Sequence, residues 1–111
     1  RIKDQIIRGG LNIDPAEIEA ALLRHPAIAE VAVVGVPDRK LGEQACAVCR
    51  VREGVAPIAF DAMVAHLAGQ GLSRKKSPEH LLFVEAMATG ATGKLDKRAM
   101  AARAAATLGR G

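Results

Sequence analysis

The chain has 111 residues, enough for one hydrophobic core but short for two, so we expect residues 1–111 to form a single domain. Half of the residues are apolar, yet Trp and Tyr are absent and the only aromatic residues are Phe60 and Phe83. The formal net charge of +4 indicates anionic partners, but nucleic acid is disfavoured because there are too few aromatic side chains for base stacking.

Several features bear on where the protein acts. No apolar run is long enough to cross a bilayer and no signal peptide opens the chain, which predicts a cytoplasmic protein without a transmembrane segment. Cys46 and Cys49 form a Cys-x-x-Cys pair, but the second pair that a zinc site needs is missing, so we expect no metal site. They fall in a predicted strand, where they would point to opposite faces as buried, reduced thiols. The chain begins at Arg1 without an initiator Met, which we interpret as the start of a fragment.

The first quarter of the chain predicts a hairpin followed by a helix. Two short apolar stretches, residues 6–7 and 11–13, flank a pair of glycines, a pattern typical of a tight hairpin. Asp14 is a good helix N-cap, with Pro15 in the first turn and Glu17 at the capping-box position. The helix should end before the next proline.

The middle of the chain predicts two long strands and a second helix. Residues 27–36 and 44–52 alternate between apolar and polar, and we expect them to pair as an antiparallel hairpin with a break at residues 37–38. Apolar residues recur at helical spacing over residues 60–67. A basic loop over residues 73–78 follows.

The last third predicts a third strand over residues 81–84, a small-residue loop over residues 88–94 and a final helix starting at Leu95 or Asp96. Strands and helices do not alternate regularly. We therefore predict an α+β domain with a short N-terminal hairpin and a central three-stranded, mainly antiparallel sheet flanked by helices.

Lys94 is the residue with the clearest potential for chemistry. It ends the small-residue loop directly before a helix, and an ammonium presented in this way suits a phosphoryl or phosphate-ester group whose negative charge it would offset. The alternative is a solvated surface lysine at a helix start. A P-loop is excluded because only two residues separate the glycines before Lys94 and Leu95 follows it.

Three separated blocks of residues match one family pattern in order. The first block contains Arg1, Lys3, Asp4, Ile6, Gly9, Gly10, Asn12, Ile13, Pro15, Glu17, Ile18 and Glu19. The second contains His25, Pro26, Ala32, Val33, Val34, Gly35, Pro37, Asp38, Gly42 and Glu43, and the third contains Thr92, Gly93 and Lys94. Over nearly its whole length the chain resembles the C-terminal domain of the adenylate-forming superfamily, which includes acyl-CoA synthetases, luciferases and peptide-synthetase adenylation domains.

The resemblance implies a two-step reaction and a role for each matched residue. A carboxylate attacks ATP, with Mg²⁺ held mainly by an N-terminal domain, and a thiol then displaces AMP from the acyl-adenylate. Lys94 matches the lysine that orients the carboxylate and stabilises charge near the α-phosphate in the first step. Arg1 and Lys3 match the hinge about which the small domain rotates, and Gly9 and Gly10 match the loop that lines the pantetheine tunnel in the second step.

Two further features stay open at this stage. Arg74, Lys75 and Lys76 could contact the phosphates of CoA or could form a solvated basic loop. The family motif usually has Pro, a basic residue and Thr where residues 88–90 of this chain are Ala, Thr and Gly. Losing the proline and gaining a glycine is expected to loosen the loop that carries Lys94.

These observations predict the C-terminal domain of an acyl-CoA synthetase, inactive without its own N-terminal domain and acting with a carboxylic acid, ATP, Mg²⁺ and CoA. CoA is preferred as the acceptor because residues 1–4 and 9–12 resemble acyl-CoA synthetases more than peptide-synthetase domains. One alternative is adenylation followed by transfer to a carrier-protein thiol. The alternative from another class is a basic binding module without catalysis.

Overall fold

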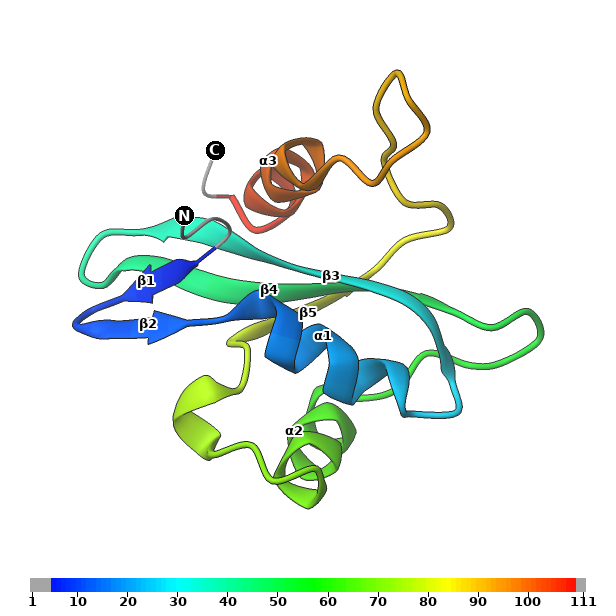
Figure 1. Cartoon of the computed structure of the whole chain (residues 1–111), viewed down its shortest axis with the longest axis horizontal. Helices are drawn as coiled ribbons and strands as arrows, with labels where there is room; N and C mark the ends of the chain where they lie inside the picture. Colours follow the sequence, from blue (N-terminus) through cyan, green and yellow to red (C-terminus); the bar gives the residue numbers. More distant parts are fainter. Residues whose placement is uncertain (1–4, 110–111) are drawn as a thin grey trace.

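A computed structural model describes residues 5–109, in which helices cover both faces of one mixed β-sheet (Figure 1). The strands are β1 (Ile6–Arg8), β2 (Leu11–Ile13), β3 (Ile28–Asp38), β4 (Gly42–Val51) and β5 (His80–Phe83). The helices are α1 (Pro15–Leu23), α2 (Phe60–Gly69) and α3 (Lys97–Thr107), with a short 3₁₀ turn, η1 (Arg74–Lys76). The predicted α+β class is confirmed. Within residues 5–109 no helix has the length and apolar character needed to span a membrane.

The long hairpin of β3 and β4 forms the centre of the sheet, as predicted. The two strands pair antiparallel from Ile28 with Val51 to Asp38 with Gly42. The break that we expected after residue 36 is wrong, because β3 continues through Pro37. Among the described strands β3 pairs with β4 alone, so it is an edge strand, where a residue without an N–H group is tolerated.

The other edge of β4 is shared by β1 and β5. β5 runs parallel to β4, and β1 meets β4 antiparallel through the pair Arg8 and Gly42. Glu79 lies between them: its Oε1 accepts a hydrogen bond from Ala45 N at 2.8 Å, and its Oε2 forms an ion pair with Arg8. The predicted sheet of three strands is therefore too small, because the N-terminal hairpin joins it and makes a sheet of five.

Two apolar cores lie on opposite faces of this sheet. α1 and α2 cover one face and α3 covers the other (Figure 1). Cys46 faces the core under α3 and Cys49 faces the core under α1 and α2, so the prediction of free, buried thiols on opposite faces is confirmed. Burial raises the pKa of both thiols from 9.0 to about 12, which keeps them protonated at neutral pH.

Side-chain caps fix the starts of α1 and α3. Asp14 caps α1 as predicted, since its Oδ1 accepts a hydrogen bond from Ala16 N at 3.0 Å. Glu17 was expected to close a capping box, but its Oε1 instead accepts a charge-assisted hydrogen bond from Lys76 Nζ at 3.1 Å. Asp96 caps α3 by accepting from the amide three residues later, which settles the start of that helix.

Candidate functional site

Lys94 lies at the end of a small hairpin that leads into α3. Thr89 and Leu95 pair as an antiparallel bridge, Gly90 N donates to Lys94 O at 2.8 Å, and Gly93 N donates to Gly90 O at 3.0 Å. Gly93 has a φ of 83°, a conformation that side chains other than glycine rarely adopt. The backbone of Lys94 is thus held by a closed turn and not by an extended loop.

The base of this hairpin is fastened to α3. Asp96 N donates to Ala88 O at 2.9 Å, and Ala88 N donates to Met100 Sδ at 3.2 Å. Met100 is fully buried between α3 and the sheet. These contacts anchor the segment in which the family motif is altered, and the loosening expected from its Ala-Thr-Gly sequence stays a prediction.

The side chain of Lys94 is exposed and forms no ion pair with any other residue in the part of the chain that the structure describes. Its ammonium is therefore available to an anionic group supplied from outside these residues. Within residues 5–109, no cluster of three or more His, Cys, Asp or Glu side chains is arranged to hold a metal ion.

The tip of the β1–β2 hairpin consists of the two glycines that the sequence singled out. Arg8 pairs with Leu11, so Gly9 and Gly10 form the whole connection. Gly9 has a φ of 61° and its N donates to Leu41 O, in the β3–β4 turn, at 2.8 Å. Gly10 is different, because it is exposed and a Cβ added to it would meet no atom within 4 Å. The turn explains Gly9, whereas nothing in the fold requires a glycine at position 10.

The carboxylate of Glu43, for which we had predicted no role, joins this hairpin to the sheet. Glu43 Oε1 accepts a hydrogen bond from Ile7 N at 3.0 Å. The Glu43 side chain crosses Gly35 so closely that a Cβ there would lie 2.7 Å from Oε2. Asp38 Oδ2 accepts from the amides of residues 40–41 and shapes the neighbouring turn. Asp38 and Glu43 both belong to the second family block, but their match to the family did not indicate that Glu43 binds the first hairpin.

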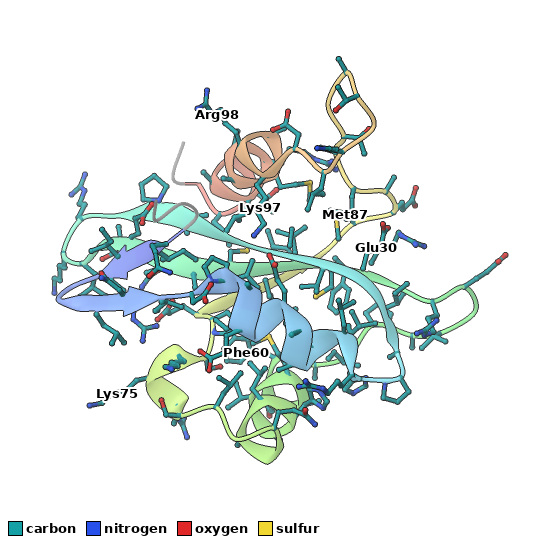
Figure 2. The ribbon with its side chains drawn as sticks, viewed as in Figure 1. Glu30, Phe60, Lys75, Met87, Lys97 and Arg98 are labelled. Atoms are coloured by element: carbon teal, nitrogen blue, oxygen red, sulfur yellow. The ribbon has the colours of Figure 1, made fainter. Side chains whose placement is uncertain are left out.

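The basic run Arg74, Lys75 and Lys76 forms η1, on the same side of the sheet as α2 (Figure 1). Lys76 forms an ion pair with Glu17, whereas Arg74 and Lys75 are exposed. Figure 2 shows Lys75 extending away from the ribbon. Two of the three predicted phosphate contacts are therefore free to meet an anion.

The structure does not bring the predicted site residues into one cleft. The loop over residues 88–94 projects at the top right of the view and the β1–β2 tip lies at its left edge, with η1 below the sheet (Figure 1). Arg1 and Lys3, the predicted hinge residues, lie outside the described residues. The chain thus has separate candidate surfaces, one with Lys94 and one with Gly9 and Gly10.

A small α+β domain that presents a lysine on a hairpin before its last helix has counterparts among known proteins. Residues 17–94 match the family model described as the AMP-binding enzyme C-terminal domain. Since this match covers more than half of the chain and ends at Lys94, the chain belongs to the family of AMP-binding enzyme C-terminal domains.

Individual relatives agree with this membership. The chain is 43% identical over 109 residues to a mitochondrial medium-chain acyl-CoA ligase of Danio rerio, covering 98% of the chain and 18% of the relative. It is 40% identical over 100 residues to a salicyl-AMP ligase / salicyl-S-ArCP synthetase of Mycobacterium tuberculosis, covering 90% and 17%. The solved structure of a Mycobacterium tuberculosis fatty acyl CoA synthetase superposes with a TM-score of 0.83 at 38% identity, covering 96% and 21%. The chain spans only about a fifth of the length of these proteins.

Proposed function

We propose that this chain is the C-terminal domain of an AMP-forming acid–CoA ligase. The whole enzyme converts a carboxylic acid and ATP into an acyl-adenylate and pyrophosphate, and then transfers the acyl group to CoA with release of AMP. The observation that carries the proposal is the presentation of Lys94, an exposed ammonium on a closed hairpin at the end of the family match. The acyl-CoA ligase and synthetase among the similar proteins support thioester formation.

In this proposal Lys94 acts in the first half-reaction. Its ammonium donates hydrogen bonds to the carboxylate as that group attacks the α-phosphorus, and it offsets negative charge on the α-phosphate oxygens. One donor aimed at charge that develops in a transition state contributes a factor of about 10²–10³. We place the sites for ATP, Mg²⁺ and the acid mainly on an N-terminal domain, as the resemblance to the adenylate-forming enzymes implies.

The β1–β2 tip serves the second half-reaction. The missing side chain at Gly10 leaves room for the pantetheine arm of CoA, and the exposed Arg74 and Lys75 are available to its phosphates. Since the tip and the Lys94 loop lie at separate surfaces, the domain has to rotate between the two steps, and we assign the hinge to Arg1 and Lys3.

A carrier-protein thiol is the second candidate acceptor. The similarity to a salicyl-AMP ligase / salicyl-S-ArCP synthetase favours it, since that name includes both an adenylate and a thioester on a carrier. The two candidates share the adenylation step and differ only in what carries the thiol, so the acceptor must be determined directly.

The proposal is tested with the complete enzyme. Acid-dependent exchange of pyrophosphate into ATP is measured over a panel of fatty, alicyclic and aromatic acids, and free CoA or a carrier protein is then added. We expect exchange with at least one acid and thioester formation with free CoA. A thioester only on the carrier protein would select the second candidate, and no acid-dependent exchange with any acid would contradict the proposed function.

A further inference from the structure

An ion pair that passes the open edge of β3 joins α3 to α1. Lys97 Nζ lies 2.5 Å from Glu19 Oε2, and the same oxygen accepts a hydrogen bond from Val33 N at 2.8 Å. Figure 2 shows Lys97 directed from α3 toward β3, whereas its neighbour Arg98 points away from the sheet. One carboxylate therefore connects the two helices, which lie on opposite faces, through the edge strand between them.

This pair differs from an ordinary surface ion pair. The side chains of Lys97 and Glu19 are 26% and 19% exposed, compared with 37% and 49% for the pair of Arg50 and Glu30. The backbone amide of Val33 fixes the carboxylate, so less side-chain freedom is lost when the ammonium binds. The restraint is consequently stronger than the small contribution typical of exposed pairs.

The position of Lys97 in the sequence shows which part of α3 the ion pair restrains. Lys97 is the first residue of α3 and follows Lys94 by three positions. The fully buried contacts of α3 are made by Met100, Ala104 and Ala105, and the partly buried Ala101 and Leu108 pack beside them. Hydrophobic contacts are non-directional, so they hold the helix against the sheet without orienting its first turn as the ion pair of Lys97 does.

The hairpin that carries Lys94 is hydrogen-bonded to the first turn of α3. Asp96, which caps this helix, donates its amide to Ala88 and thereby closes the base of the hairpin. Any shift of the start of α3 is therefore passed to the loop that presents Lys94. Displacing a catalytic group by about 1 Å can cost about 10²-fold in rate.

We propose that Glu19 and Lys97 are positioning residues for Lys94. They hold the start of α3, and with it the hairpin, where the Lys94 ammonium reaches the carboxylate and α-phosphate during adenylation. The inference rests on the function proposed above. Within residues 5–109 neither residue forms a hydrogen bond or an ion pair with Gly9 or Gly10, so we expect thioester formation to change little when the pair is removed.

The test measures the two half-reactions separately in the complete enzyme, for Glu19→Gln and for Lys97→Met. Adenylate formation should fall by about 10- to 100-fold in each variant, while thioester formation from pre-made acyl-adenylate should stay within about twofold of wild type. Lys97→Arg keeps the charge and should restore adenylation. The double variant should be no worse than the poorer single variant, because the two residues act as a unit.

Glu30→Gln is the matched control, since it removes an ion pair elsewhere on the sheet, with Arg50, and should leave both half-reactions unchanged. Amide hydrogen exchange supplies a readout that does not depend on activity. Exchange over residues 88–96 should be faster in Lys97→Met than in wild type and unchanged in Glu30→Gln.

Three outcomes would overturn the positioning role. These are adenylation within twofold of wild type in both variants, equal losses in both half-reactions, and an equal loss in Glu30→Gln. Lys94→Ala serves as the reference. If Lys94→Ala loses adenylation while Glu19→Gln and Lys97→Met retain this activity, only the positioning role is wrong. If Lys94→Ala retains adenylation, the proposed function of Lys94 is wrong and so is the inference that rests on it.

Discussion

Lys94 and Gly10 are two residues whose chemistry the fold itself does not explain. Lys94 is a cation without an ion-pair partner in the described part of the chain, and Gly10 is a glycine with ample space around it. By contrast, Gly9 and Gly93 have positive φ angles that their turns require. Substitutions at Lys94 and Gly10 should therefore change activity without changing the free energy of unfolding.

The substitution Gly10→Leu tests whether position 10 lines the pantetheine tunnel, because it should impair thioester formation without destabilising the fold. The new side chain meets no atom within 4 Å of its Cβ, so the free energy of unfolding should change by less than about 0.5 kcal/mol. Thioester formation should fall by about tenfold or more because the side chain obstructs the thiol, while adenylation should be retained. Urea unfolding and the two half-reaction assays check this. Unimpaired transfer to CoA would rule out a tunnel at this position.

The buried thiols predict an alkaline limit to stability. The pKa of Cys46 and Cys49 is raised in the folded state, so between about pH 9 and about pH 12 the folded protein binds more protons than the unfolded one. Their contribution is fully present below pH 9 and is lost as the pH rises through this window. Thermal unfolding against pH should be steeper for wild type than for Cys46→Ala/Cys49→Ala. Identical alkaline slopes would contradict this, as would rapid alkylation of the native thiols at pH 8.

At the scale of elements, the features predicted correctly are those that depend on residues close together in the sequence. The Asp14 cap, the long antiparallel hairpin and the loop before α3 follow from capping, alternation and small residues. The parallel pairing of β5 and the attachment of β1 were missed because both join segments that lie far apart in the sequence, as the ion pair of Glu79 with Arg8 does. The link between Glu19 and Lys97 was missed for the same reason.

The contact between Gly35 and Glu43 should be visible as a coupling energy. Gly35→Ala places a Cβ 2.7 Å from Glu43 Oε2 and should displace the carboxylate from Ile7 N, at a cost of about 0.5–1.5 kcal/mol in the free energy of unfolding for the lost hydrogen bond. In a Glu43→Ala background the same substitution should cost much less, because the clash is gone. Urea unfolding of the four proteins measures the coupling. Equal costs in both backgrounds would show that the carboxylate is not the obstacle.

At the scale of the whole molecule, the sequence predicts which residues belong to the candidate site but not where they lie in space. The motif around Lys94 and the glycines of the first hairpin were found in the sequence, but their separation in space depends on the assembled sheet (Figure 1). No pattern in the sequence indicated that Glu43 holds one of these surfaces. The two surfaces, and a chain that spans about a fifth of its relatives' length, support the proposed role of a domain that completes sites on another part of an enzyme.

The chain alone should therefore fold without catalysing the reaction. Its two cores and the five-stranded sheet lie within residues 5–109, so we expect a cooperative unfolding transition. A mixture of the 111-residue chain with acid, ATP, Mg²⁺ and CoA should give no acyl-CoA above background, as followed by chromatography. Turnover by the isolated chain would mean that the ATP and acid sites lie within it.

The most direct test of the account compares the complete enzyme with its Lys94→Ala variant in the two half-reactions. Adenylate formation from acid and ATP should fall by about 10²–10³-fold, while thioester formation from pre-made acyl-adenylate and CoA should be nearly unchanged. Lys94 would then be the catalytic cation of the first step alone. If neither half-reaction changes, Lys94 is a surface lysine and the central claim is wrong.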